Sequence, residues 1–218
     1  MNAAYVAALQ VGAGVVLFCA VMTLWRRGVR TIVSLLGVQG LALGAVALVL
    51  GLHERNAALL ASGGLVVILK GVVIPGVLLR ASRLDPLSRE TRPLVNVPAS
   101  LVAAAVLIVL SYVSSARLTS LAPSVATRLV PLGVATILVG YFMLVTRRRA
   151  VSKIVGLILV DNGIALVAYL LTSGVPFVVE MGSSIDVLLV VVVLQFLLLS
   201  MRRHSDVDAL TERRELHD

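Results

Sequence analysis

The chain has 218 residues, of which 59% are hydrophobic and 14% are charged, and its mean hydropathy is +1.05. This composition excludes a soluble globular domain and indicates an integral membrane protein. The net charge of +8 does not indicate a nucleic-acid-binding protein, because the basic residues are concentrated beside the ends of long apolar stretches.

Seven apolar stretches are long enough to cross a bilayer, since a membrane-spanning helix needs about 20 mostly apolar residues. In chain order they cover residues 4–25, 31–52, 57–79, 98–116, 126–146, 151–172 and 178–201. The first stretch is not a cleaved signal peptide, because its apolar region is too long and its basic residues follow it. We therefore expect an all-α integral membrane protein with about seven transmembrane helices.

The basic residues predict the orientation of these helices. Arginine clusters follow the first, third, fifth and seventh stretches, whereas few basic residues lie at the opposite ends. By the positive-inside rule, the N-terminus is outside and the C-terminus is cytoplasmic.

The chain also aligns with itself at an offset of 123 residues, without a gap. Thr23 then meets Thr146, Arg26 meets Arg149, and Gly40 meets Gly163. Because four stretches separate equivalent points, the two units have the same orientation in the membrane and are parallel repeats. We expect a three-helix repeat over 1–80, a linker and joining helix over 81–125, a second repeat over 126–203 and a cytoplasmic tail over 204–218.

Three ionisable residues lie inside the apolar stretches: Lys70, Asp161 and Asp186. Charged groups at this depth usually face a bundle interior or a water path, and they mark function. At a rise of about 1.5 Å per residue from the nearest basic residue, Asp161 lies roughly 12 Å deep, Lys70 roughly 15 Å and Asp186 roughly 24 Å. We expect staggered titratable groups that relay protons or cations, bridged by water or by the amides of Gln39 and Asn162.

A structural alternative remains for the charged residues, in which Lys70 and one aspartate form an ion pair that locks helices together. We expect Pro75 and Gly71 to kink the third stretch below Lys70 and to free backbone carbonyls for a cation or water. Close helix packing is an equal alternative for that segment. Gln195 is nine residues from Asp186 and therefore lies on the opposite helix face, which favours a structural role.

Metal or cofactor chemistry is not expected in this chain. Cys19 is alone, and His53, His204 and His217 are placed in loops or the tail without ligand spacing. No cofactor is therefore predicted, and no catalytic activity is expected from the chain by itself.

The stretch Arg147-Arg-Arg-Ala-Val-Ser-Lys-Ile-Val-Gly-Leu-Ile-Leu-Val-Asp161-Asn-Gly, followed by Ser184-Ile-Asp186, resembles two three-helix membrane subunits. These are NuoK of respiratory complex I and MrpC of multisubunit cation/proton antiporters. The whole chain, with its second copy, joining helix and Lys70-Gly-Val-Val-Ile-Pro75 segment, resembles the E component of hydrogenase-4 (HyfE) and HycP-like hydrogenase subunits.

In NuoK-like subunits, carboxylates of the second and third helices belong to a central hydrophilic axis, so the resemblance implies those roles for Asp161 and Asp186. Aligning on Val155 places the second-helix acid at Ile158, one turn before Asp161.

The resemblance implies a non-catalytic membrane-arm subunit of a group 4 hydrogenase or formate hydrogenlyase-like complex in the bacterial cell membrane. Its expected partners are antiporter-like and NuoH-like membrane subunits, soluble hydrogenase and iron–sulfur subunits, and the lipid bilayer, but not nucleic acid. The alternatives are a structural scaffold subunit and a subunit of a multisubunit antiporter. A stand-alone transporter is disfavoured because no inverted repeat is visible.

Overall fold

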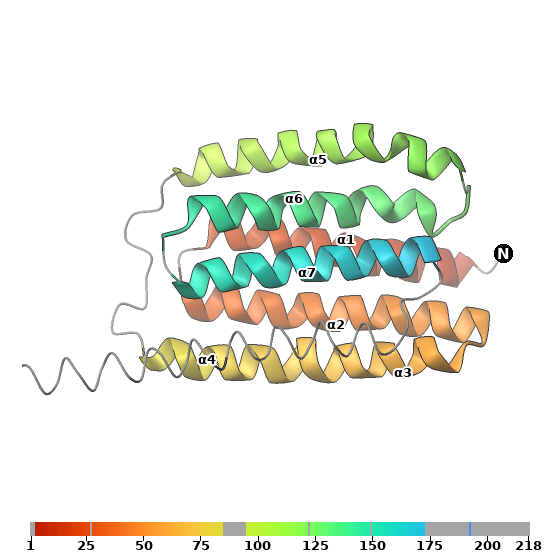
Figure 1. Cartoon of the computed structure of the whole chain (residues 1–218), viewed down its shortest axis with the longest axis horizontal. Helices are drawn as coiled ribbons and strands as arrows, with labels where there is room; N and C mark the ends of the chain where they lie inside the picture. Colours follow the sequence, from red (N-terminus) through yellow and green to blue (C-terminus); the bar gives the residue numbers. More distant parts are fainter. Residues whose placement is uncertain are drawn as a thin grey trace, which may run out of the picture.

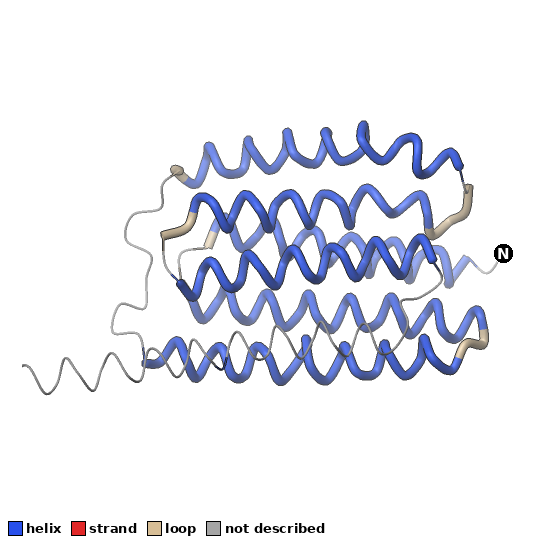
Figure 2. Tube along the Cα trace, in the orientation of Figure 1, coloured by secondary structure: helices blue, strands red, loops and turns tan. Residues whose placement is uncertain are grey.

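The computed structural model describes residues 3–26, 28–84, 95–121, 123–148 and 150–172, together with residue 192. All regular secondary structure in these ranges is helical (Figures 1 and 2). The elements are α1 (Ala3–Trp25), α2 (Val29–Glu54), α3 (Ala57–Val66), the π-helix η1 (Val67–Val73), α4 (Ile74–Leu84), α5 (Val97–Leu121), the 3₁₀-helix η2 (Thr127–Leu129), α6 (Val130–Thr146) and α7 (Ala150–Thr172).

Six of the described helical segments are long and apolar enough to cross a membrane. They are Ala3–Trp25, Val29–Glu54, Ala57–Arg80, Val97–Arg117, Thr127–Thr146 and Ser152–Leu171, and the third runs continuously through α3, η1 and α4. These segments coincide with the first six predicted stretches, so the prediction of an all-α, multi-pass membrane protein is confirmed at this level. The predicted seventh stretch, 178–201, and the tail 204–218 lie outside the described residues, as do Asp186 and Gln195.

Short connections between helices follow from local chemistry. Arg55 adopts a left-handed conformation, with φ of 54°, at the C-terminus of α2. The next residue, Asn56, caps α3, because its side-chain oxygen accepts hydrogen bonds from the backbone N–H groups of Ala58 and Leu59 at 3.0 and 3.4 Å. The two residues together reverse the chain direction and place α3 antiparallel to α2.

The helices form a bundle in which α1 packs against α2 and α6, and α2 packs against α3, η1 and α7 (Figure 1). Helix α5 lies at one edge of the bundle, on α6 and α1. Apolar burial does not drive helix association inside lipid, so close backbone packing has to stabilise the contacts. Small residues permit it between α6 and α7: a Cβ on Gly140 would lie 2.8 Å from Val160, and one on Gly163 would lie 2.7 Å from Ile137.

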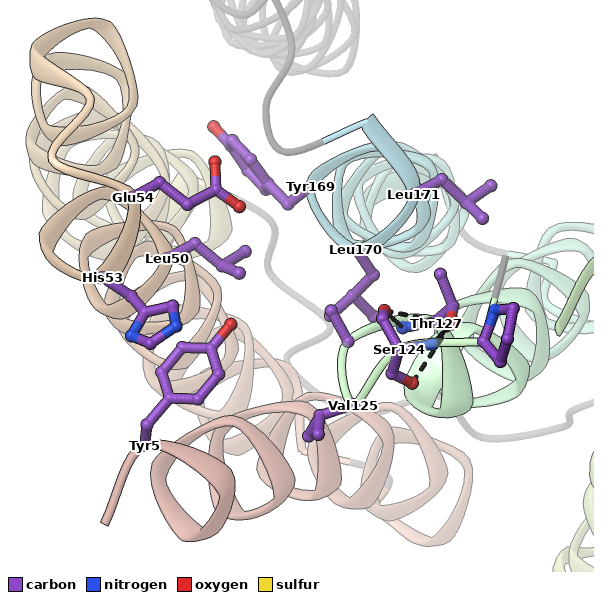
Figure 3. A pocket seen from close by; sticks show the side chains of 12 residues that line it. Tyr5, Leu50, His53, Glu54, Ser124, Val125, Thr127, Tyr169, Leu170 and Leu171 are labelled. Atoms are coloured by element: carbon purple, nitrogen blue, oxygen red, sulfur yellow. Dashed lines mark hydrogen bonds between the residues drawn. The ribbon is translucent and has the colours of Figure 1, made fainter. Parts of the chain in front are cut away.

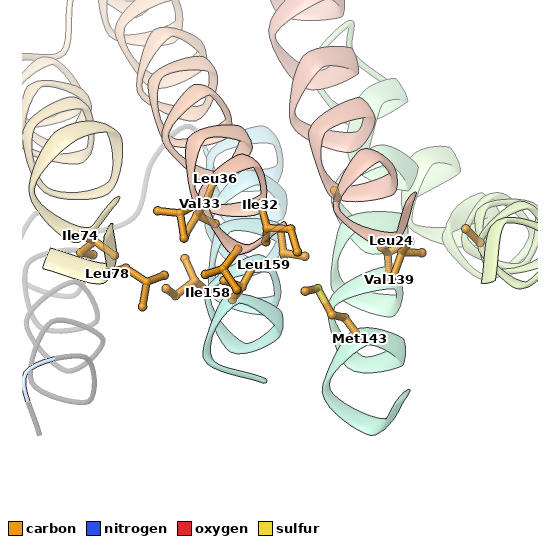
Figure 4. Close-up of a cluster of buried hydrophobic side chains, with 14 residues drawn as sticks. Leu24, Ile32, Val33, Leu36, Ile74, Leu78, Val139, Met143, Ile158 and Leu159 are labelled. Atoms are coloured by element: carbon orange, nitrogen blue, oxygen red, sulfur yellow. The ribbon is translucent and has the colours of Figure 1, made fainter. Parts of the chain in front are cut away.

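Two buried apolar clusters divide the bundle along its length. The first cluster lies toward the arginine-rich ends and joins residues such as Leu24, Ile32, Leu78, Met143 and Leu159 from five helices (Figure 4). The second cluster lies toward the opposite end and includes Leu9, Leu43, Val46, Leu59 and Leu166. The residues between the two clusters on α2, η1 and α7 include the polar side chains that make up the candidate site.

Candidate functional site

Lys70 of η1 and Asp161 of α7 form an ion pair in the middle of the bundle. The Lys70 Nζ lies 2.8 Å from the Asp161 Oδ2, and the two side chains are 0% and 19% exposed. The predicted depths of these residues differ by only about 3 Å, which the side chains span. The structure therefore joins Lys70 and Asp161 in an ion pair, as in the alternative of the sequence analysis in which Lys70 pairs with one aspartate.

The backbone around Lys70 departs from α-helical geometry. The π-helix η1 surrounds this residue, and the proline at position 75 follows it. Proline has no N–H, so the carbonyl of Gly71 loses the donor that an α-helix would supply, and a wider turn accommodates that loss. The predicted disturbance near Gly71 and Pro75 thus takes the form of a π-helical turn within a continuous helical segment.

The freed carbonyls face glycines of α2. A Cβ on Gly40 would overlap the carbonyl group of Lys70, and one on Gly37 would lie 3.2 Å from the carbonyl oxygen of Gly71. Between the two alternatives for this segment, the contacts favour close helix packing over an open carbonyl site for a cation. Gly40 thereby allows η1 to approach α2 closely enough for the Lys70 side chain to reach Asp161 on α7.

A pair of amides lies beside the ion pair. Asn162 Nδ2 donates to Gln39 Oε1 at 3.0 Å, and Gln39 Nε2 donates to the Val16 carbonyl at 3.0 Å. Gln39 and Asn162 are both fully buried, so each hydrogen bond replaces one that water cannot supply. The Oδ1 atom of Asn162 accepts no hydrogen bond within the described part of the chain. The amides link α7, α2 and α1.

The ion pair and the amides form one polar layer between the two apolar clusters. On α2, Gln39 lies between Leu36 of the first cluster and Leu43 of the second; on α7, Asp161 and Asn162 lie between Leu159 and Ala165. Within the described residues, apolar layers therefore separate the charged pair from both ends of the bundle.

Sequence reasoning missed a buried role for Arg147, which it used only as a marker of topology. Arg147 is 3% exposed, and its Nη2 donates to the carbonyls of Leu24 at 2.8 Å and Thr23 at 3.5 Å. These carbonyls belong to the last turn of α1, which lacks intrahelical donors. The guanidinium therefore caps α1 from the end of α6. The available signal was an arginine at the end of a predicted span, because helix ends leave backbone carbonyls without intrahelical donors.

A cavity of about 560 Å³ at the opposite end of the bundle was also not predicted (Figure 3). Tyr5 and His53 form one wall as stacked rings 3.9 Å apart, with Glu54 beside them. His53 lies in the last turn of α2, so its predicted placement in a loop was wrong. The cavity is not the charged site, because Tyr169 in its lining follows Asp161 by eight residues, about 12 Å along α7.

Comparison with known proteins identifies a relative of nearly equal length. The chain is 38% identical, over 218 residues, to the uncharacterized protein Rv0085 of Mycobacterium tuberculosis. The match covers 98% of this chain and 99% of the relative. No model of a protein family matches the chain, and neither does any solved structure. At this identity and coverage, the chain belongs to the same protein family as Rv0085.

Proposed function

We propose that this protein is a non-catalytic membrane-arm subunit of a complex I-related assembly, such as a group 4 hydrogenase or formate hydrogenlyase-like complex. In this role it contributes to proton or cation translocation, while partner subunits carry out the redox chemistry. The observation that carries the proposal is the Lys70–Asp161 pair, with its 2.8 Å contact and its position between two apolar layers. Charged groups at such depth are expensive and mark ion paths in membrane proteins.

The pair has chemistry suited to proton transfer in a medium of low dielectric constant. Transfer of one proton from Lys70 Nζ to Asp161 Oδ2 converts two opposite charges into a neutral amine and a neutral acid. The net charge is zero before and after the step, so no isolated charge is left in the bilayer. A proton that leaves the acid, or one that reaches the amine, then completes an exchange with the surroundings.

The direction of that exchange supports a role within a larger assembly. Among the described residues, apolar layers separate the pair from both bundle ends, whereas Asp161 keeps 19% of its side chain exposed. A partner subunit or water at that exposed surface supplies the shortest route for a proton. We expect antiporter-like and NuoH-like subunits as membrane partners, with hydrogenase and iron–sulfur subunits attached in the cytoplasm.

The proposal includes two parallel three-helix repeats and a seventh span over residues 178–201. Two contacts support the repeat: Asn162 with Gln39 and Arg147 with Leu24 each join positions that are 123 residues apart. In a duplicated chain, equivalent residues meet at the axis that relates the repeats. The proposed location is the bacterial cell membrane, with the N-terminus outside and the arginine-rich ends of the helices in the cytoplasm.

A structural scaffold is the second candidate function, and a specific observation favours it as well. Lys70 is fully buried, and the ion pair ties the third span to α7 across the face of α2. A subunit of a multisubunit antiporter would share the charge-carrying role but would lack redox partners. The ion pair is compatible with both functions, so its effect on proton conduction and its effect on assembly have to be measured separately.

The deciding experiment compares Asp161→Asn with the charge swap Lys70→Asp/Asp161→Lys in the intact complex. Assembly is measured on native gels, and coupling is measured as redox-driven proton uptake by inverted vesicles. Conduction predicts that the swap restores assembly without restoring proton uptake, because the order of donor and acceptor is reversed. Full recovery of both by the swap would support the scaffold and contradict a conducting role. Asp186→Asn extends the test to the second predicted acid, with Glu54→Gln at the bundle end as the control.

A further inference from the structure

One face of α7 is exposed or partly exposed along its length and carries the site carboxylate at its centre. Its members are Lys153, Leu157, Asp161, Ile164, Ala168 and Leu171, and we call this face the α7 seam. Leu157, Ile164 and Leu171 are 38%, 53% and 37% exposed. The spacings are all three or four residues, as in the contact stripe of a helix that packs along another helix. The seam therefore has the pattern of a helix-docking surface.

A comparison with α2 shows that the carboxylate distinguishes the α7 seam from the equivalent face of that helix. The positions 123 residues earlier, from Arg30 to Leu48, form a similar outward face on α2. Val38 and Leu41 are 48% and 44% exposed there, and they correspond to Asp161 and Ile164. The α2 face is apolar through its middle, and Leu41 and Leu48 on it contact Gly71 and Gly63 of the third span. The α7 seam has the same shape of exposure but places a carboxylate at the point where α2 has valine.

The carboxylate is incompletely satisfied within the described residues. Oδ2 of Asp161 meets Lys70, and among the residues that the structure describes Oδ1 receives no hydrogen bond. Lipid chains have no donor to offer this oxygen, and a polar group left unpaired in hydrocarbon costs several kcal/mol. A hydrogen-bond donor at the middle of the seam would therefore satisfy this oxygen.

We infer that the α7 seam binds a transmembrane helix of a different partner subunit, and that this helix presents a donor side chain at the level of Asp161. Apolar residues above and below would pack on Leu157, Ile164 and Leu171 with the shallow crossing common in membrane bundles. The donor would contact Oδ1 while Lys70 keeps Oδ2. This inference rests on the proposed function, since it names the face through which the subunit meets its assembly.

The first experiment places a photo-crosslinking amino acid at position 164 or at position 41 of the full chain, in membranes that contain the native complex. We expect the residue at 164 to form an adduct with a copurifying membrane subunit. Peptide mapping should locate the adduct on a transmembrane helix, with a donor side chain within one turn. Position 41 is the matched control, because Leu41 packs against Gly71 of the chain's own third span, and it should yield no adduct with a copurifying subunit. An adduct from position 164 to lipid alone, to residues 178–201 of the same chain, or to a second copy would overturn the inference.

The second experiment asks whether the carboxylate itself holds the partner helix. Lys70→Met and Lys70→Met/Asp161→Val are compared in the crosslinking background, so that the two chains differ only in the acid. An interhelical hydrogen bond in a membrane has a strength that corresponds to roughly threefold to tenfold in association. The yield at position 164 should fall by about that factor in the double variant. Equal yields would overturn the role of Asp161. Proton uptake is not read in either experiment, so loss of conduction and loss of docking are distinguished.

Discussion

Asn162 donates a hydrogen bond to Gln39 across 3.0 Å, and the two residues lie 123 positions apart in the chain. The bond joins α7 to α2, and the second hydrogen bond of Gln39, to Val16, extends the link to α1. Since Gln39 and Asn162 are both fully buried, the amides fix how the two halves of the bundle are rotated against each other. That rotation determines whether Asp161, the residue beside Asn162, meets Lys70.

Asn162→Leu should destabilise the bundle by about 1–3 kcal/mol, because Gln39 Oε1 is then buried without a donor. Gln39→Leu should cost a similar amount through the loss of two hydrogen bonds. The double variant should cost less than the two single variants together, since neither partner is left unpaired. Thermal unfolding in detergent measures all three, and strictly additive losses would contradict a direct bond.

The ion pair should show the same behaviour with a similar amplitude. Lys70→Met leaves Asp161 without its cation, and removal of one member of a buried pair costs about 3–5 kcal/mol at most. The partial exposure of Asp161 reduces this cost, so about 2 kcal/mol is expected. Lys70→Met/Asp161→Leu should recover much of the stability, because an apolar pair replaces a charged one. The test is denaturation in mixed micelles of the unchanged chain, the two single variants Lys70→Met and Asp161→Leu, and the double variant. No recovery of stability in the double variant would argue against pairing.

The sequence predicts the six described spans well because hydropathy and length are sufficient for that purpose. It predicts the importance of Lys70 and Asp161 for the same reason, since charge in an apolar stretch is visible without a fold. Their contact is not predictable from helical periodicity, because periodicity gives a face on one helix and not the rotation between two helices. Arg147 and Arg148 look alike in sequence, and only the position of the end of α1 distinguishes the buried arginine from the exposed one.

Gly40→Ala should disrupt the approach of η1 to α2. The added methyl group would overlap the Lys70 carbonyl, which is backbone and cannot rotate away. We expect a loss of about 1–3 kcal/mol, as for overpacking in a core, and a weaker Lys70–Asp161 pair. Gly64→Ala is the matched control, because no atom lies within 4 Å of its added Cβ and alanine favours a helix by up to about 1 kcal/mol. The measurement is the unfolding midpoint of each variant. Equal midpoints would show that the contact between Gly40 and the Lys70 carbonyl is not tight.

Arg147→Gln should separate the capping role of this side chain from its role in topology. The substitution removes the donor to the carbonyls of Leu24 and Thr23, and hydrogen bonds from charged groups contribute about 1.5–3 kcal/mol. Arg26→Gln removes the same charge from the same end of the bundle, but Arg26 is exposed. Both variants weaken the positive-inside signal equally, so orientation assays should respond alike, whereas thermal stability should fall only for Arg147. A fall of the same size in both would mean that charge at this end, and not the cap on α1, sets the stability.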